Sequence, residues 1–381
     1  MYGCLKSARL FWDHLSNHLS KMGFTQNNYD LCVANKTIND NICTITWHVD
    51  DLKISHKDES VVQQVIKQIE KEYGEMSVTT GSVHSYCGMK LIFKDRQVEI
   101  EMIDYLKDTV TELPENCDVT ITTPAASHLF DVNEKQEKLD HEKKQLFHTF
   151  VAKLLFVSKR GRPDIQVAIA FLSTRVIEPD IDDWKKLTRL LRYINSTINL
   201  VLTLSVDSFS NIKWWVDASY ATHHNSRSHT GGTMTMGKGS IFSTSCKQKI
   251  NARSSTEAEL IGVNDVAGQI IWTRNFINEQ GYNINTSTLF QDNKSAMLLE
   301  QNGILSSSKR TKHINVRYYF IKDCIDRKEI HVIYCPTESM IGDYFTKPLQ
   351  GSKFVKFRDI IMGSACFGSL NKERVEEIKG I

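Results

Sequence analysis

The sequence predicts an α/β domain over residues 205–350, built on a mixed sheet flanked by helices, and an α+β region before it. Two observations predict this class. Strand-like segments and helical segments follow one another in the order three strands, helix, strand, two helices, strand, which is typical of an α/β sheet rather than a bundle or a sandwich. The 381 residues are also 41% hydrophobic and 24% charged, with a net charge of +2, and this composition excludes wholesale disorder, collagen and coiled coil.

Residues 1–110 are predicted to contain two amphipathic helices and two hairpins. The helices are indicated by apolar residues that recur every three to four positions, and the strands by side chains that alternate between two faces. Asp50 and Asp51 interrupt the first pair of strands and are therefore placed at the tip of a hairpin. The predicted elements are helices over 10–22 and 60–73, a hairpin of 41–49 with 52–55, and a hairpin of 86–93 with 98–102.

Residues 111–204 are predicted to form a small helical module. Helical periodicity is present over 147–158, 165–174 and 182–196. The charged run over 133–144 is interpreted as a solvated loop or helix face rather than a binding patch, because charge runs are most often solvent-exposed.

Residues 205–350 alternate strands and helices. Trp214 and Trp215 are neighbours on the first strand, so we expect one ring to fill the core and the other to be partly exposed. Residues 237–239 join the second and third strands. The predicted elements are strands over 213–216, 230–236 and 240–245, a long helix from Ser254 past Trp272, a strand over 287–290, helices over 294–300 and 317–326, and a strand over 329–334.

The chain is accordingly divided into segments 1–110, 111–204 and 205–362 and a tail of 363–381. No apolar run reaches the roughly 18 residues that span a bilayer, and the N-terminus lacks the pattern of a signal peptide. The nine cysteines are an odd number without a C-x-x-C pair, which argues against a disulfide framework or a zinc knuckle. We therefore expect a cytoplasmic or nuclear protein that is not secreted and does not contact a membrane.

Four acidic residues of the last domain stand at or near the ends of predicted elements. Asp217 ends the first strand and Glu259 lies early in the long helix, whereas Asp292 and Asp343 follow the fourth and fifth strands. The carboxyl ends of neighbouring strands meet in the crevice where open α/β sheets bind their ligands. Clustered carboxylates repel one another unless hard cations neutralise them, and Mg²⁺ prefers such oxygen ligands. Two ions about 4 Å apart can activate a water and stabilise the leaving oxygen of a phosphodiester.

Each of these carboxylates also has a purely structural interpretation. Asp217 can start a turn, Asp292 can be the N-cap of the next helix, and Asp343 can be a surface acid. The segment Ser254–Glu257 fits a capping box, so its glutamate is interpreted as a helix cap. Glu259, two residues further on, has no capping role, which favours it as the projecting carboxylate.

In combination, these motifs resemble the ribonuclease H domain of Ty1/copia-type retrotransposon polyproteins. The segments that carry the resemblance there are Val216–Ala221, Ser254–Leu260, Gln291–Ala296, Thr311–Ile314 and Asp343–Leu349. Other segments resemble the reverse-transcriptase palm, the hairpin that follows it, and the helical segment that joins polymerase to nuclease. These segments are Tyr2–Arg9, His48–Asp51, Tyr86–Lys90, 153–156, 162–165 and 184–193. The resemblance covers about residues 1–362.

The resemblance implies a fold and an activity. It implies a ribonuclease H-like mixed sheet flanked by helices, preceded by an incomplete palm and a helical thumb or connection. The four carboxylates would bind two Mg²⁺ ions, for which Mn²⁺ can substitute, and the protein would cleave the RNA strand of an RNA–DNA hybrid. By family, it would be associated with virus-like particles in the cytoplasm or the nucleus.

The sequence departs from the family pattern in the palm. The family has a further aspartate on a strand upstream of the Tyr-Gly motif, and this sequence begins at that motif, so Asp50 and Asp51 lack that partner and the fingers subdomain. His48 stands where the family usually has a tyrosine. We therefore expect a C-terminal fragment of a longer polyprotein without RNA-directed DNA polymerase activity, and primer extension by the purified chain would contradict this.

Several other residues invite interpretation. His223 and His224 are interpreted as part of a solvated loop, because Mg²⁺ rarely takes imidazole. Lys312 and His313 are expected to contact the hybrid backbone. The hydroxyl of Ser255 is suited to the 2′-OH and phosphates of RNA, although helix capping also explains it.

Three functions remain open from the sequence. The leading hypothesis is a Mg²⁺-dependent nuclease acting on hybrids. The alternative is a non-catalytic nucleic-acid-binding remnant of a degenerate retrotransposon, which salt-dependent binding without cleavage would favour. A third is a polymerase completed by a separate chain that supplies the missing aspartate.

Overall fold

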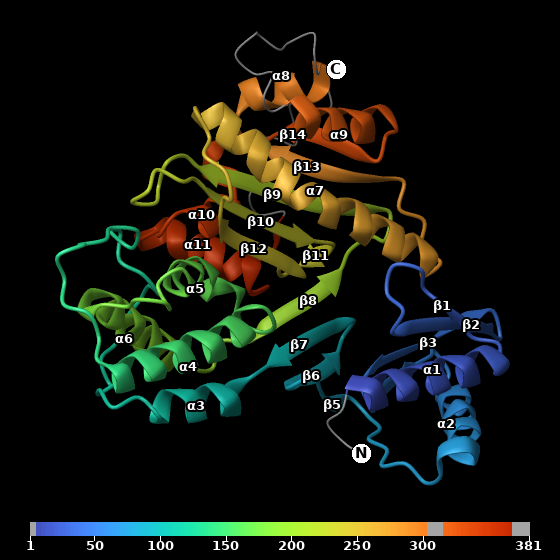
Figure 1. Cartoon of the computed structure of the whole chain (residues 1–381). Helices are drawn as coiled ribbons and strands as arrows, with labels where there is room; N and C mark the ends of the chain where they lie inside the picture. The colour runs from blue at the N-terminus through green and yellow to red at the C-terminus, as the bar shows by residue number, and fades with distance from the viewer. Residues whose placement is uncertain (1–4, 303–314, 368–381) are drawn as a thin grey trace. The chain divides into compact units, whose positions relative to one another are not determined.

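The computed structural model describes residues 5–302 and 315–367 and divides into two compact units. The first unit comprises Met1–Gly88 with Ile271–Ile284, and the second comprises Met89–Ile270 with Asn285–Ile381. Figure 1 labels the elements of both units. Within the described residues, no helix is long and apolar enough to cross a membrane.

The first unit is an antiparallel sheet packed with two helices. Its strands lie in the order β1-β2-β3-β4. The core of the unit is lined by apolar side chains of both helices and of the sheet, among them Leu15, Val65 and Trp47. The elements are α1 (Leu5–Lys21), β1 (Thr25–Gln26), β2 (Val33–Ile38), β3 (Asn41–His48), β4 (Asp51–Ser55), α2 (Glu59–Tyr73) and β5 (Val83–Tyr86).

The predicted hairpin with Asp50 and Asp51 at its tip is confirmed. Strands β3 and β4 pair antiparallel, with His48 opposite Asp51, and Val49 has a left-handed φ of 58°. The predicted single strand over 86–93 is wrong at its start. Cys87 and Gly88 have φ values of 50° and 77°, which an extended strand does not adopt, so β5 ends at Tyr86 and a new strand begins at Met89. Strands β1 and β2 are not among the elements predicted from the sequence.

The second unit contains two sheets and a cluster of helices. Strands β6, β7, β8 and β11 pair antiparallel in that order. The predicted turn between β6 and β7 is confirmed, because Lys94 pairs with Gln97. The elements here are β6 (Met89–Lys94), β7 (Gln97–Glu101), α3 (Ile103–Thr111), α4 (His141–Ser158), η1 (Pro163–Ile165), α5 (Gln166–Ser173), α6 (Ile181–Ser196), β8 (Leu202–Val206) and β11 (Gly237–Lys238).

The second sheet of this unit has the order β12-β10-β9-β13-β14. Strand β10 is antiparallel to both of its neighbours, β9 and β12, whereas β13 is parallel to both β9 and β14, which is the mixed sheet predicted from the sequence. Its elements are β9 (Asn211–Ser219), β10 (His229–Thr235), β12 (Phe242–Lys247), α7 (Ser255–Glu279), β13 (Thr286–Gln291), α8 (Lys294–Asn302), α9 (Asn315–Asp326), β14 (Ile330–Tyr334), η4 (Thr337–Ser339), α10 (Asp343–Thr346) and α11 (Gly351–Ile361).

Two adjacent glycines of β10 let helices approach this sheet from both sides. A Cβ atom on Gly231 would lie 2.6 Å from Thr346 Cγ2 and 2.8 Å from the carbonyl carbon of Phe345, both in α10. On Gly232 the nearest atom would be Cγ2 of Val266 in α7, at 3.3 Å. Successive residues of a strand point to opposite faces, so α7 covers one face and α10 the other. Figure 1 shows α7 running along its face of the sheet.

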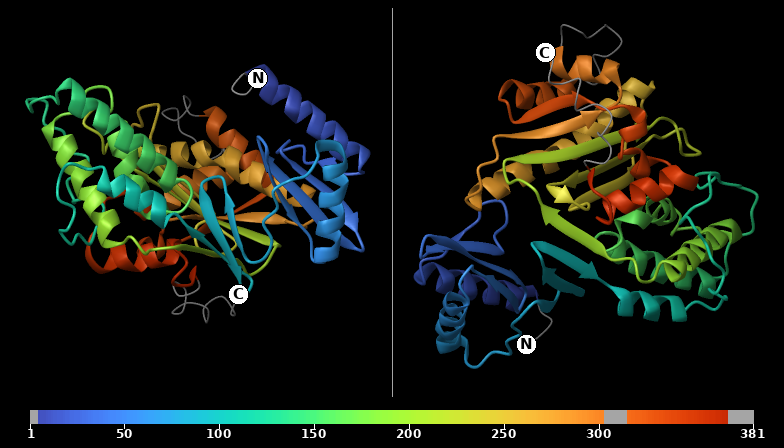
Figure 2. Two further views of the ribbon diagram at one scale, coloured as in Figure 1. Left: turned by 90° about the horizontal axis from the view of Figure 1, so that it is seen from below. Right: turned by 180° about the vertical axis from the view of Figure 1, so that it is seen from behind.

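One hydrophobic core joins the helical segment to the second sheet. It contains side chains of α4, α5 and α6 together with others from α10, α11 and β9, and Figure 2 shows the green helices gathered beside the red ones. Both faces of the sheet are therefore covered. The expectation for the tryptophan pair is wrong, because Trp214 and Trp215 are both buried. Trp214 lies against Phe242, and Trp215 stacks on Phe290 with ring centroids 4.7 Å apart.

A buried ion pair ties these helices together. Arg162 and Asp164 form two parallel N–H···O bonds of 2.8 Å, and Tyr193 donates its hydroxyl to the same carboxylate at 2.8 Å. The hydroxyl of Tyr344, in α10, donates to the Asp164 carbonyl oxygen at 3.1 Å. The guanidinium also bonds to Thr197. Every charged oxygen and nitrogen atom of the pair thus has a hydrogen-bond partner. This is the condition under which such a pair can be buried without a large cost in free energy.

Candidate metal centre

Three of the four predicted carboxylates meet in the structure. One carboxylate oxygen from each of Asp217, Glu259 and Asp292 lies within 4.8 Å of the others. Over residues 5–302 and 315–367, this is the one such group of three or more side chains with metal-binding atoms. The three residues come from β9, from the first turns of α7 and from the residue after β13. The adjacent parallel strands β9 and β13 bring two of them to the same end of the sheet.

Asp217 lies within β9, two residues before the end of that strand, and is buried. It pairs in register with Gly231, and the missing side chain of that glycine leaves room for α10. Gly342 is equally close, because a Cβ atom there would lie 2.8 Å from Asp217 Cβ. The Thr346 hydroxyl donates to Asp217. Burial, opposed by the charge of Lys347 and reinforced by nearby carboxylates, raises the pKa of Asp217 to about 6.

Glu259 projects from the second turn of α7 and is only 5% exposed. The predicted capping box is confirmed in part: Ser254 Oγ accepts from the Glu257 N–H at 3.2 Å, and the Glu257 carboxylate accepts from the N–H of Arg253, the residue before the predicted cap, at 2.9 Å. Glu259 has no such role. A backbone hydrogen bond from Ala218 holds its carboxylate, while Oε2 has no hydrogen-bond partner among the described residues. Burial and the neighbouring aspartates raise the pKa of Glu259 well above its ordinary value.

Asp292 directly follows β13, and the structure separates it from the capping role. Asn293 Oδ1 accepts from the backbone N–H groups of Ser295 and Ala296, at 3.0 and 3.1 Å, and so caps α8. The Asp292 carboxylate instead accepts from the Thr337 hydroxyl at 3.3 Å. Burial and the charge of Asp343 raise the pKa of Asp292. Three carboxyl groups with raised pKa values in one place are typical of a functional site.

Asp343 is placed beside the group but does not belong to it. It begins α10 and is buried. Its Oδ1 forms an ion pair with Lys347, and its Oδ2 lies 2.7 Å from Lys353 Nζ. Lys347 Nζ also lies 3.6 Å from Asp217 Oδ2. The predicted cage of four carboxylates is thus observed as three converging carboxylates and a fourth neutralised by lysines.

The interpretation of His223 as part of a solvated loop is wrong, although His224 is exposed. His223 is buried and lies outside the metal-binding group. Its Nε2 lies 3.0 Å from His229 Nδ1, and His229 Nε2 lies 2.8 Å from Ser245 Oγ. The Ser245 hydroxyl donates to the Phe345 carbonyl oxygen at 2.7 Å. Because Ser245 donates its proton to the Phe345 carbonyl oxygen, His229 donates through Nε2 and accepts at Nδ1, which makes it neutral, and His223 donates to it through Nε2.

This chain of hydrogen bonds predicts a pH dependence. Burial lowers the pKa of His223 to about 4 and that of His229 to about 3, from an ordinary value of 6.5. Between pH 6.5 and 4 these two histidines become protonated in the unfolded chain but stay neutral in the folded chain. The free energy of unfolding should therefore fall as the pH drops through this range. Urea titrations at several pH values measure this slope. We expect His223→Gln to flatten it and His224→Gln to leave it unchanged; a slope equally steep in all three proteins would contradict the assignment.

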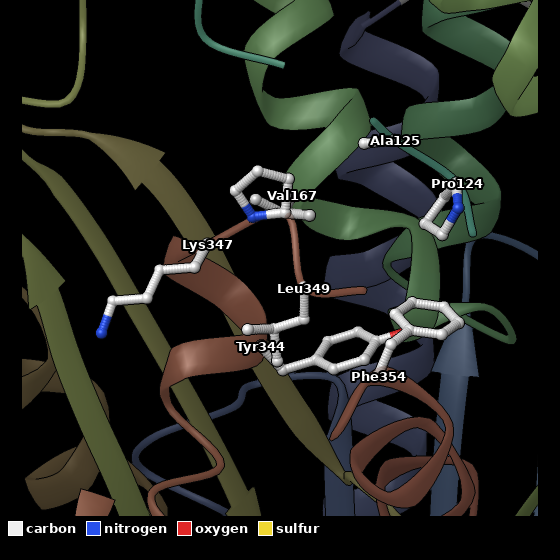
Figure 3. Close-up of a pocket in the computed structure, with 8 residues that line it drawn as sticks. Pro124, Ala125, Val167, Tyr344, Lys347, Leu349 and Phe354 are labelled. Carbon is white, nitrogen blue, oxygen red and sulfur yellow. The ribbon is translucent and has the colours of Figure 1, made fainter. Parts of the chain in front are cut away.

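The remaining predicted site residues are distributed as follows. Asp50 and Asp51 are exposed at the β3–β4 tip in the first unit. Ser255 is exposed at the start of α7, one turn before Glu259. Lys312 and His313 lie outside the described residues. A small cavity beside α10, lined in part by Tyr344 and Phe354 (Figure 3), has a volume of about 10 Å³, which is the space of roughly one water molecule rather than of a substrate.

The three converging carboxylates fit a hard divalent cation. All of the ligand atoms are oxygens, which suits Mg²⁺ or Mn²⁺ and not a soft metal. The Glu259 Oε2 atom, buried without a partner in the described part of the chain, is the kind of atom that a bound ion would satisfy. The raised pKa values of the three carboxyl groups arise first from burial and then from the neighbouring carboxylates, and a bound cation would offset both effects.

Comparison with solved structures shows the fold to which the chain is similar. The foamy viral protease–reverse transcriptase, solved in complex with an RNA/DNA hybrid, superposes with a TM-score of 0.51 at 12% identity, covering 88% of this chain and 39% of that one. The chain therefore has the fold of a retroviral-type reverse transcriptase with a ribonuclease H-like mixed sheet. No protein-family model matches the chain.

Comparison with curated protein sequences finds relatives along most of the chain. The chain is 25% identical over 370 residues to the retrovirus-related Pol polyprotein from transposon TNT 1-94 of Nicotiana tabacum, covering 95% of this chain and 27% of that protein. It is 24% identical over 360 residues to that of transposon RE1 of Arabidopsis thaliana, covering 94% and 24%. It is also 26% identical over 276 residues to a putative transposon Ty5-1 protein of Saccharomyces cerevisiae, covering 71% and 87%.

These matches identify the family. The homologues of the chain are Ty1/copia-type retrotransposon Pol polyproteins, a reverse transcriptase/ribonuclease H-like family. The chain spans about a quarter of the length of the first two relatives.

Proposed function

We propose that the second unit hydrolyses the RNA strand of RNA–DNA hybrids with the help of Mg²⁺, for which Mn²⁺ can substitute. The observation that carries this proposal is the convergence of two buried carboxylates, Asp217 and Glu259, with the half-buried carboxylate of Asp292, from separate elements at one end of a mixed sheet. Carboxylates arranged in this way are suited to phosphodiester hydrolysis. The family and the neighbouring structure, which was solved with an RNA/DNA hybrid, make such a hybrid the substrate to test first.

The residues of the chain would act by holding ligands and water in place. Asp217, Glu259 and Asp292 would hold the ions, with Asp343 joining them once released from its lysines; bound ions would activate a water and stabilise the leaving oxygen. Hydrogen bonds already orient each ligand, since Thr346 donates to Asp217, Ala218 to Glu259 and Thr337 to Asp292. Such outer partners keep metal ligands in a binding geometry.

Substrate contacts belong to the same proposal. Ser255 lies one turn before Glu259 on α7, so its hydroxyl is on the face of the helix that leads to the carboxylates. We assign it to the sugar-phosphate backbone of the RNA strand, together with Lys312 and His313. Contacts of this kind position a nucleic acid without reading its sequence.

Hydrolysis of a labelled hybrid by the purified chain tests the proposal. We expect cleavage of the RNA strand with Mg²⁺ or Mn²⁺ and none with EDTA, and a loss of roughly two orders of magnitude or more in Asp217→Asn and in Asp292→Asn, the scale seen when transition-state stabilisation is removed. Asp326→Asn, an exposed carboxylate at the end of α9, is the matched control and should retain full activity.

Two outcomes would count against the proposal. Cleavage that survives in the Asp217→Asn, Asp292→Asn double variant would refute the site. Salt-dependent binding of the hybrid without cleavage at any Mg²⁺ concentration would instead favour the non-catalytic remnant.

A further inference from the structure

Two lysines stand beside the carboxylates. Lys347 Nζ contacts Asp343 and lies 3.6 Å from Asp217 Oδ2, so one ammonium group bridges two carboxylates. Lys353 Nζ lies 2.7 Å from Asp343 Oδ2, the other oxygen of that carboxylate. Asp217 therefore belongs to two arrangements at once. One is the group it forms with Glu259 and Asp292, and the other is its ion pair with Lys347.

The backbone of Lys347 is anchored, whereas its side chain can move. Lys347 N–H donates to the Asp343 carbonyl oxygen at 2.9 Å, and the preceding turn is held by the bond from Tyr344 to Asp164 and by that from Ser245 to Phe345. Figure 3 shows the ammonium group extending away from Tyr344 and Phe354. The side chain is 40% exposed, so its flexible stem can carry the ammonium group into solvent without disturbing α10.

The negative charge around Asp217 is neutralised on the side of Lys347 but not on the side of Glu259. On one side, Glu259 Oε2 is buried and has no hydrogen-bond partner among the residues that the structure describes. On the other side, the Lys347 ammonium group supplies positive charge to Asp217 and Asp343. Like charges a few ångströms apart repel strongly in a partly buried site. A divalent cation and this ammonium group therefore cannot occupy the space between Asp217 and Asp343 together.

We infer that Lys347 is a built-in competitor for one of two divalent cations. The first ion enters between Asp217, Glu259 and Asp292 with Lys347 in place. A second ion reaches the Asp217–Asp343 side only when the ammonium group swings out, so occupancy of that side is set by Lys347. This inference rests on the proposed metal site and assigns a regulatory role to a residue outside its ligand set.

Calorimetric titration of the nucleic-acid-free chain with Mn²⁺ tests this without any measurement of cleavage. In the unsubstituted chain we expect one tight site and a second that is weak. In Lys347→Met and Lys347→Gln the second site should bind at least about tenfold more tightly, whereas Lys347→Arg, which keeps the charge, should resemble the unsubstituted chain. Lys356→Met is the matched control, because it removes one positive charge from an exposed position of α11 and should change neither site.

The possible failures are distinguishable. If Asp217→Asn removes Mn²⁺ binding but both neutral variants at position 347 bind the second ion as weakly as the unsubstituted chain, this inference is overturned and the metal site stands. If Asp217→Asn binds Mn²⁺ unchanged, the metal site itself is wrong.

Discussion

Asp164→Ala is expected to destabilise the second unit by about 3–5 kcal/mol, the range measured when one partner of a buried ion pair is removed. Arg162 is 1% exposed and Asp164 is not exposed at all. Without the carboxylate, a guanidinium would stay buried with hydrogen bonds to Thr197 alone among the residues that the structure describes, and the Tyr193 hydroxyl would lose its acceptor. The cost is that of an uncompensated buried charge.

Urea unfolding followed by tryptophan fluorescence measures this effect. Asp182→Ala is the control, because the Asp182 side chain is 39% exposed and its partner Lys186 keeps the Asp131 carbonyl oxygen as an acceptor, so we expect a cost of at most about 1 kcal/mol. Replacing both partners, as Arg162→Met with Asp164→Leu, should cost less than Asp164→Ala alone, because the double variant leaves no buried charge. A single variant as stable as the Asp182 control would contradict the assigned role of the pair.

Gly231→Ala is expected to lower both stability and metal binding, and its neighbour supplies the control. The new Cβ atom would lie 2.8 Å from backbone and Cβ atoms of Phe345, and backbone cannot yield by rotating a side chain. Overpacking of this kind costs about 1–3 kcal/mol. If α10 moves outward instead, Thr346 and Lys347 lose their contacts with Asp217. The Asp217 carboxylate, which is proposed to bind the metal, would then lose its orientation as well as the packing around it.

Gly232→Ala separates this effect from a general intolerance of β10. The nearest atom to its Cβ would be Val266 Cγ2, at 3.3 Å, and the next two, Thr244 Cγ2 and the Trp215 carbonyl oxygen, would lie at ordinary contact distances of 3.5 and 3.6 Å. We therefore expect a change well below that of Gly231→Ala. Thermal unfolding with and without Mn²⁺ measures both effects, and the metal-induced rise in Tm should shrink in Gly231→Ala and persist in Gly232→Ala. Equal behaviour of the two variants would contradict the close packing of α10 on β10.

Much of the second sheet and its carboxylates could be predicted from the sequence. The order of strands and helices follows from local periodicity, which neighbouring residues determine among themselves. The placement of Asp217, Glu259 and Asp292 at element ends follows from the same patterns, and the separation of Glu257 from Glu259 follows from capping chemistry. Strands β1 and β2 escaped prediction because brief or polar strands carry little alternation, whereas β8 was missed although Leu202, Leu204 and Val206 alternate with polar residues.

Other features were decided only by the tertiary structure. Alternation places Trp214 and Trp215 on opposite faces but cannot show that α7 covers one face and the core formed with α4, α5, α10 and α11 covers the other. The buried His223 is hydrogen-bonded to His229, which lies on β10. Asn293 caps α8, so Asp292 does not have that role. The pairing of Asp343 and Asp217 with Lys347 joins α10 to β9. Each depends on contacts between elements distant in the sequence, and local patterns of residues carry no information about such contacts.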